Sequence, residues 1–245
     1  MINSGENFIE QTKYYNLGPS DQSRGKPYPP LQASYDQQLT KITLSPPDQL
    51  NPPPVDLKKV IETRTSVRNY SSHPLTLFEL TYLLWSTQGV KKNLSGKATF
   101  RTVPSAGARH AVETYILINR VSSLAPGIYR YLALEHSLLE ISDDQDCSDK
   151  ITKGGLEQEM IRNSAATFIW VAIPYRMTWR YQERGYRYLF LDAGHVCQNL
   201  YLSALQLNCG VCAIAAFDDD KLNYYLNLDG KSQFVIYMAS VGKLS

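Results

Sequence analysis

Residues 186–207 read YRYLFLDAGHVCQNLYLSALQL, and this stretch decides which fold the chain can adopt. Its apolar residues recur at steps of three and four, which is the spacing of one face of an α-helix. Gly210 lies just beyond, as is usual after a helix ends. The spacing predicts a long helix whose apolar face consists of Leu189, Ala193, Val196, Leu200 and Ala204.

Strand-like segments lie on both sides of this helix in the sequence. They are rich in β-branched and aromatic residues, and the stretch AATFIWVAI is typical of a buried strand. The predicted strands are residues 113–119, 127–132, 165–173, 211–215 and 233–241.

Further helices are expected between these strands and before them. Thr76 and Glu79 form a capping box, and Gly89 is typical of the residue that follows a helix. Helices and strands are mixed without a regular βαβ alternation, which favours an α+β fold over a doubly wound one. The predicted helices are residues 55–61 running into Arg64, 76–89, 149–162 and a segment capped by Asp218.

Residues 1–54 differ in composition from the rest of the chain. Prolines recur from Pro19 to Pro54 and interrupt helices and strands alike. We therefore expect an extended, Pro-rich N-terminal arm over 1–54 and a single domain over 55–245. A monomer gains little from so long an arm, so we expect it to wrap over a partner subunit.

Composition excludes several classes of protein. The chain of 245 residues is long enough for one large domain with a buried core. Its 25 basic and 23 acidic residues give a net charge of +2 without a continuous basic stripe, so a nucleic-acid partner is not expected. The longest apolar stretches are too short to span a bilayer, and the first residues lack a signal-peptide pattern. We expect a cytoplasmic protein that does not enter a membrane.

The four cysteines are too few and too irregularly spaced for a disulfide framework. Cys209 and Cys212 form a C-x-x-C pair, but it stands where a helix ends and a strand begins. A reactive thiol pair usually stands at the start of a helix, where the helix dipole lowers a thiol pKa. We interpret the cysteines as buried small residues and expect no metal site.

Residues 64–68 (RTSVR) hold two guanidinium groups and two hydroxyls in a short loop. Alternate side chains of an extended segment point the same way, so Arg64, Ser66 and Arg68 are expected to converge on one side. Guanidinium and hydroxyl donors suit a phosphate. A solvated surface loop and a kinase phosphorylation site are alternative interpretations of the same motif.

Two other segments hold candidate residues. Small residues at 104–109 (PSAGAR) would let the backbone approach a flat ligand closely, but taken alone this segment is better explained as a purely structural loop. A serine-hydrolase site is excluded because the G-x-S-x-G elbow is absent. On the predicted long helix, Asp192, His195 and Asn199 form one polar stripe. One histidine does not make a zinc motif, so we expect this stripe to form internal hydrogen bonds.

Taken in order, these segments resemble the nitroreductase-like FMN-dependent oxidoreductase family, and most closely its SagB-type dehydrogenase branch. Each motif is short, but their number and order make the combination specific. The resemblance runs through residues 12–13 (TK), 64–68 (RTSVR), 83–89 (LLWSTQG), 101–109 (RTVPSAGAR), 126–131 (PGIYRY), 184–188 (RGYRY), 192–200 (DAGHVCQNL) and 241–243 (VGK).

The resemblance implies a central, mostly antiparallel sheet flanked by helices, in an intertwined homodimer with FMN at the subunit interface. Arg64, Thr65 and Ser66 would hold the FMN phosphate and ribityl chain, and Lys243 would be a further phosphate contact. Arg68 would lie near the pyrimidine edge of the flavin, where a cation raises the flavin's potential.

The flavin ring has two further expected contacts in this resemblance. Small residues of the 104–107 loop would reach it from the partner subunit, and a backbone N–H of the 214–216 segment would point at N5. The residues concerned are Pro104, Ser105, Ala106, Gly107, Ile214, Ala215 and Ala216. Ala215 and Ala216 depart from the family pattern, which often has glycine there.

A second departure concerns the candidate catalytic residues, Arg180 and Tyr181. Azoline-oxidising relatives are expected to have Lys-Tyr at this position. Arginine stays protonated at any working pH and is a poor general base. Tyr181 could act as an acid, position a substrate or simply pack.

The predicted function is two-electron transfer at flavin N5 by a ping-pong mechanism, with NAD(P)H or an organic molecule as donor. The absence of a dinucleotide-binding fingerprint agrees with a nicotinamide that stacks on the flavin only transiently. One alternative is a peptide thiazoline or oxazoline dehydrogenase of a SagB-type pathway. The other is a non-catalytic flavin-binding module.

Overall fold

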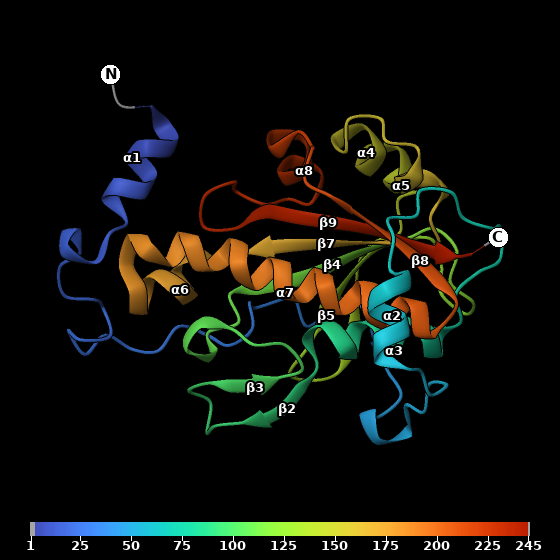
Figure 1. The fold of residues 1–245 in the computed structure, drawn as a ribbon, viewed down its shortest axis with the longest axis horizontal. Helices are drawn as coiled ribbons and strands as arrows, with labels where there is room; N and C mark the ends of the chain where they lie inside the picture. Colours follow the sequence, from blue (N-terminus) through green and yellow to red (C-terminus); the bar gives the residue numbers. More distant parts are fainter. Residues whose placement is uncertain (1–2, 245) are drawn as a thin grey trace.

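The computed structural model describes residues 3–244, which fold around one large sheet (Figure 1). Its seven strands lie in the order β1-β6-β5-β4-β7-β9-β8, and every neighbouring pair is antiparallel. The predicted α+β fold with a mostly antiparallel central sheet is therefore confirmed. The strands are β1 (Lys41–Thr43), β4 (Val112–Ile118), β5 (Gly127–Leu132), β6 (Ser137–Ser142), β7 (Ala166–Ala172), β8 (Cys209–Ile214) and β9 (Phe234–Lys243).

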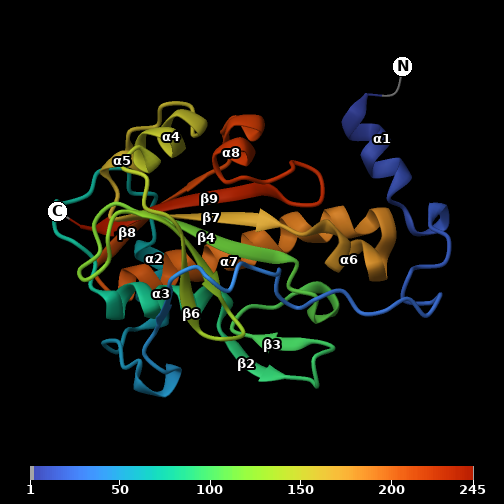
Figure 2. The same cartoon turned by 180° about the vertical axis from the view of Figure 1, so that it is seen from behind.

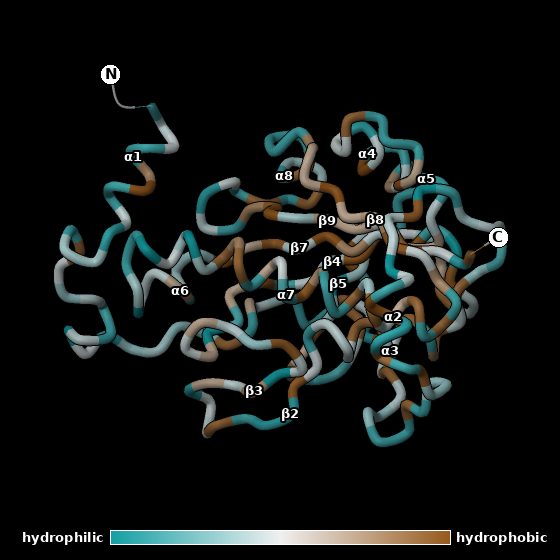
Figure 3. Tube along the Cα trace, in the orientation of Figure 1, coloured by the Kyte–Doolittle hydropathy of each residue, from teal (hydrophilic) through white to brown (hydrophobic). Residues whose placement is uncertain are grey.

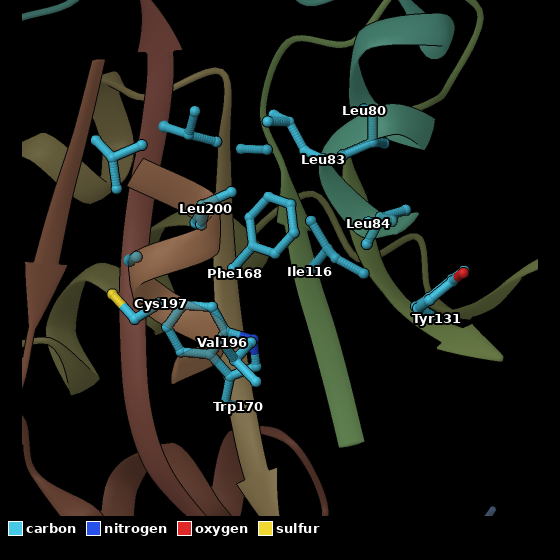
Figure 4. Packing of buried hydrophobic residues seen from close by; sticks show 14 of the residues in the cluster. Leu80, Leu83, Leu84, Ile116, Tyr131, Phe168, Trp170, Val196, Cys197 and Leu200 are labelled. Atoms are coloured by element: carbon cyan, nitrogen blue, oxygen red, sulfur yellow. The ribbon is translucent and has the colours of Figure 1, made fainter. Parts of the chain in front are cut away.

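One face of the sheet is covered by a group of helices that lies in front of it in Figure 1. Leucines of α3 and α7 pack there against aromatic side chains of β7, and Figure 4 shows Leu84, Leu200 and Phe168 meeting in this layer. Burial of such side chains supplies most of the driving force for folding. The helices of this face are α2 (Leu57–Thr63), α3 (Leu77–Gln88) and α7 (Gly185–Gln206).

Shorter helices cover the opposite face. Ile151, Ile161 and Leu222 pack there with Val171 of β7 in a second, smaller core. Figure 3 shows the strands and the inner turns of the helices as the apolar parts of the chain, with polar connections around them. The helices of this face are α4 (Cys147–Gly154), α5 (Met160–Asn163) and α8 (Asp219–Tyr225).

Most predicted elements are present, with two corrections. The helix expected over 149–162 is divided into α4 and α5, because Leu156 and Glu157 both adopt a left-handed conformation with φ of 57°. Gly89 does end α3, but its φ of −57° is not the left-handed value expected of a glycine cap. A Cβ atom there would lie 2.4 Å from the Trp85 ring, so lack of space explains this glycine.

The structure differs from the expected irregular arm in two places. Helix α1 (Ser4–Gln11) forms before the first proline, with a capping box between Asn3 and Glu6, and β1 adds an edge strand beside β6. Much of the arm lies on its own subunit, as Figure 2 shows from behind. Arg176 Nε donates to the Pro30 carbonyl at 2.8 Å, for example.

Several short elements escaped the sequence analysis. The hairpin β2 (Val90–Asn93) and β3 (Thr99–Arg101) projects from the body of the molecule in Figure 1. Helix α6 (Pro174–Tyr181) precedes α7, and 3-10 turns occur at Tyr14–Asn16, Pro47–Gln49, Ala106–Ala108 and Gln182–Arg184. Within residues 3–244, no helix is both long and apolar enough to cross a membrane.

Candidate active site

The RTSVR motif lies along the edge strand β8. Helix α2 ends at Thr63, and Arg64 turns the chain into an extended path. Ser66 then forms a parallel bridge with Val211, and the Val67 N–H donates to the Val211 carbonyl at 2.9 Å. The motif is thus held by backbone hydrogen bonds to β8, and its polar side chains remain free for other contacts.

Tyr201 of α7 joins this segment to β8. The Ser66 and Tyr201 hydroxyl oxygens are 3.0 Å apart, and the Ala213 N–H donates to the Tyr201 oxygen at 2.9 Å. The Arg64 guanidinium lies over the Tyr201 ring, 5.2 Å from its centroid. With Tyr201 donating its proton to Ser66, the Ser66 proton is free for a bound acceptor.

Sequence analysis missed Tyr201. The residue is only 8% exposed, and on the predicted helix it follows Leu200 of the apolar face. A tyrosine next to the apolar face of a predicted helix is expected to be buried, and a buried tyrosine usually has a hydrogen-bond partner for its hydroxyl. That position is the one signal in the sequence that could have pointed to Tyr201.

Arg68 does not lie with Arg64 and Ser66, so the expected convergence of all three side chains is wrong. Arg68 lines a cavity of about 280 Å³ with Glu159, Met160 and Asn163, and neither Arg64 nor Ser66 lines it. Beyond the motif, the Tyr70 hydroxyl donates to the Val67 carbonyl at 2.7 Å.

The arginines of the motif have no acidic partner. Neither Arg64 nor Arg68 forms a salt bridge within the described part of the chain, and Thr65, Ser66 and Arg68 are exposed. Each guanidinium group is therefore free of an ion-pair partner, and Arg64 is available to an external anion together with Ser66.

Lys243 lies at the end of β9, opposite Cys209 of β8 in the strand register. Its ammonium group pairs with Glu79 and also donates to the Leu207 carbonyl at 3.1 Å. Unlike the two arginines, Lys243 thus already has a carboxylate partner.

The 214–216 segment continues β8. Ile214 is buried, whereas Ala215 and Ala216 are exposed. Ala215 lines a cavity of about 500 Å³ together with Ala193 and Gly194 of α7. Most of the other residues that line this cavity are large and apolar or aromatic, so it offers an apolar space beside the strand end.

The 104–107 loop lies elsewhere, beside α6. The Ala106 N–H donates to Asp192 at 3.3 Å, and Ser105 Oγ accepts from the His110 N–H at 2.8 Å. Gly107 has φ of +58°, and a Cβ atom there would come within 2.5 Å of the Tyr181 hydroxyl. Pro104 precedes these residues and is exposed. The loop needs its small residues because Tyr181 packs directly against it.

Arg180 and Tyr181 stand at the end of α6. The Tyr181 ring packs edge-on against Tyr188 with centroids 4.8 Å apart, and the Arg180 guanidinium lies 5.5 Å from the Tyr181 centroid. The candidate catalytic pair therefore lies with the 104–107 loop of the same chain.

Two of the three members of the polar stripe on α7 lie inside the molecule, and the third does not. Asp192 is buried and burial raises its pKa, while Asn199 Nδ2 donates to the Ser86 carbonyl at 2.9 Å. His195 is exposed, which corrects the expectation that it too would be bonded inside the molecule.

The buried-cysteine interpretation of the C-x-x-C pair is confirmed. Cys209 and Cys212 are free thiols buried on opposite faces of β8. Burial raises the pKa of Cys209 to about 12, so this thiol is not reactive at neutral pH.

The candidate residues therefore form two separate groups in one chain, and no cavity within residues 3–244 is lined by members of both. The β8 edge holds the RTSVR motif and the 214–216 segment. The 104–107 loop lies with Arg180 and Tyr181.

Known proteins share this sequence and fold. A protein of Methanocaldococcus jannaschii named as a nitroreductase is 33% identical over 189 residues, 77% of this chain and 91% of its own length. The trifolitoxin-processing protein TfxB of Rhizobium leguminosarum is 26% identical over 167 residues, covering 64% of this chain and 45% of its own. A crystal structure from Anabaena variabilis, also described as a nitroreductase, superposes with a TM-score of 0.69 at 28% identity.

The superposition covers 87% of this chain and 45% of the Anabaena chain, so the present chain spans about half the length of that protein. The profile described as "Nitroreductase family" matches residues 61–243, from α2 to the end of β9. Sequence and fold together show that the chain belongs to the nitroreductase family.

Proposed function

We propose that this protein is an FMN-dependent oxidoreductase that transfers two electrons by a ping-pong mechanism, with NAD(P)H or an organic molecule as donor. The observation that carries the proposal is the pair Arg64 and Ser66, fixed at Tyr201 without any acidic partner. When bound, FMN would supply hydride transfer at N5.

The β8 edge fits the phosphate end of such a cofactor. An unpaired guanidinium favours an anion, and a phosphate accepts two of its parallel N–H bonds. Tyr201 orients both Arg64 and Ser66, so little side-chain freedom would be lost on binding. Thr65 is exposed beside them, and Lys243 would join as a further contact by exchanging Glu79 for the phosphate.

The strand end fits the flat part of the cofactor. Ala215 and Ala216 carry no side chain large enough to block the approach of a ring to the backbone, and the Ile214 side chain is buried in the core. Ala215 borders the cavity of about 500 Å³. Arg68 would supply the cation near the pyrimidine edge, which stabilises the negative charge that develops there on reduction.

A homodimer would bring the two groups of residues together. In our proposal Pro104, Ser105, Ala106 and Gly107 of one subunit complete the flavin site of the other. The surface of α7 supports this, because Phe190 and Leu191 are each 58% exposed beside Gly194. Apolar side chains grouped on an outward helix face are typical of a subunit interface.

The direct test is to purify the protein and record its absorbance. We expect a yellow protein that releases FMN on denaturation, elutes at twice the chain mass and is bleached anaerobically by NADH or NADPH. Initial rates measured over a range of donor concentrations, at several fixed acceptor concentrations, should give parallel double-reciprocal lines, as in any ping-pong cycle. A colourless protein that gains no flavin spectrum with added FMN would sink the proposal.

A second candidate is oxidation of peptide azolines, favoured by the similarity to a trifolitoxin-processing protein. Arg180 and Tyr181 would then face the peptide. Because arginine cannot take up a proton, Tyr181 rather than Arg180 would have to handle the proton. Incubation of the flavin-loaded protein with a thiazoline peptide should show a mass loss of two hydrogens, which Tyr181→Phe should slow. No mass loss with the wild type would exclude this candidate.

A further inference from the structure

A large cavity lies beside the 104–107 loop, outside the β8 edge. Its volume is about 960 Å³, within the range of small-molecule sites. Four segments form it: the β2–β3 hairpin, residues 101–110, Arg180 of α6 and Tyr28 of the N-terminal arm. Figure 1 shows the hairpin standing away from the body next to this loop.

The charged side chains on this cavity are all basic. Lys91, Lys97, Arg101, Arg109 and Arg180 line it, and none of the lining residues is an aspartate or glutamate. Within residues 3–244, none of these five cations forms a salt bridge. Cations gathered without counter-charges repel one another, and a bound anion relieves that repulsion.

A β-bulge directs Lys91 toward the cavity. Val90 pairs with Arg101 and Lys92 pairs with Phe100, so Lys91 is the extra residue of β2. Bulges re-aim a side chain and are common beside functional sites. Lys92 is exposed on the same strand but does not line the cavity.

Arg109 is held rigidly in the wall. Its guanidinium donates to the Gly107 carbonyl at 3.1 Å and to the Lys97 carbonyl at 2.8 Å. The rings of Tyr28 and Trp179 lie 5.7 and 5.4 Å from it. Burial, and then the nearby Arg180, lower the pKa of Arg109, which reflects the lack of a carboxylate partner.

Apart from Thr102, Ser105 and His110, the rest of the wall is apolar. Leu94, Phe100, Val103 and Pro104 line the cavity together with the Tyr28 ring. The site thus combines several cations with flat and aliphatic surfaces, which suits a molecule with anionic groups on an apolar or aromatic body.

We propose that this cavity binds a phosphorylated anion of nucleotide size, with Lys91, Lys97, Arg109 and Arg180 holding its phosphates. Its role in catalysis rests on the proposed flavin site, since Pro104 and Gly107 border both. The ligand is then either the nucleotide donor or a phosphorylated acceptor. Binding itself does not depend on flavin and can be measured alone.

The test is calorimetric titration of the purified protein, flavin-loaded or not, with 2′,5′-ADP and with adenosine as the uncharged control. We expect 2′,5′-ADP to bind with an affinity that falls steeply as salt is added, while adenosine does not bind measurably. Lys91→Gln with Lys97→Gln should lower the affinity about tenfold or more, since hydrogen bonds to charged groups are strong. The matched variant Lys92→Gln should change it less than about twofold.

Equal affinity in the double variant and in Lys92→Gln would overturn the proposal, as would failure of 2′,5′-ADP to bind. Inhibition kinetics of the flavin-loaded enzyme identify the source of the ligand. Competition with NADPH assigns the cavity to the donor, and competition with a phosphorylated acceptor assigns it to the acceptor. Loss of flavin binding would sink the proposed function but leave the titration result standing.

Discussion

Arginines occur in two contrasting settings in this protein. Arg130 and Arg176 are buried and share one carboxylate, with Glu113 at 3.3 Å from Arg130 and 2.5 Å from Arg176. Arg64 and Arg68 lie at the β8 edge and form no salt bridge among the residues described. The same side chain therefore serves the fold in one region and remains available to a ligand in the other.

The buried group attaches the N-terminal arm to the sheet. Glu113 accepts from the Ala33 N–H at 2.8 Å, and Arg130 donates to the Ala33 carbonyl at 2.6 Å. Burial alone would raise the pKa of Glu113, but Arg176 and Arg130 hold it below the usual value. Glu113 is therefore ionised at neutral pH, and its charge compensates two buried cations.

The largest effect is expected from Glu113→Gln. The change leaves two buried guanidinium groups without a counter-charge and should lower the free energy of unfolding by about 3–5 kcal/mol. Urea unfolding, followed by circular dichroism, measures this. A loss below about 1 kcal/mol would mean that the buried group does not hold the arm.

Arg64→Ala should behave in the opposite way. The free energy of unfolding should fall by less than about 1 kcal/mol, the value of an exposed cation–π contact. The affinity for FMN should fall about 10- to 100-fold, because one charged hydrogen-bond donor to the phosphate is lost. Arg24→Ala, on the arm, is the matched control and should bind FMN normally. An Arg64→Ala protein with wild-type FMN affinity contradicts the distinction between the two settings.

A smaller effect concerns His110, beside the buried arginines. Burial, followed by the charge of Arg101, lowers the pKa of His110 from 6.5 to about 3. Between these values the unfolded chain binds a proton that the folded chain does not, so stability falls as the pH falls. Between pH 7 and 5 the wild type should lose about 2 kcal/mol more than His110→Gln. Parallel pH profiles for the two proteins would show that burial and the nearby arginine do not lower the pKa of His110.

The smallest effect is expected from the exposed pair of Lys58 and Glu62 on α2. Its atoms are 3.8 Å apart and both side chains are largely exposed. Glu62→Gln should change the free energy of unfolding by less than about 0.5 kcal/mol. A larger change would imply that exposed ion pairs rival the Glu113 group, which would remove the contrast.

Sequence patterns predicted the elements whose periodicity is long and regular. Helix α7 and strand β7 repeat their apolar spacing over many residues, so local pattern and tertiary packing agree. Strand β1 is held by pairing with β6, more than ninety residues later, and helix α6 mixes buried Arg176 with aromatic residues. Neither has a local pattern that indicates its state.

The candidate site was predictable only where its residues are neighbours in sequence. The RTSVR motif is such a case, and Arg64 and Ser66 do lie together. Tyr201 contacts Ser66 across 135 positions of the chain, and Glu113 meets Arg176 across 63. Contacts of that separation depend on the whole sheet, so no local motif could predict them.

The measurement that tests the central claim most directly compares FMN with riboflavin, which lacks the phosphate. Fluorescence titration of flavin-free protein should show FMN binding about 100-fold more tightly than riboflavin, and Arg64→Ala should remove most of that difference. Equal affinities for the two flavins in the wild type would contradict the claim that the unpaired cations of the β8 edge bind a phosphate.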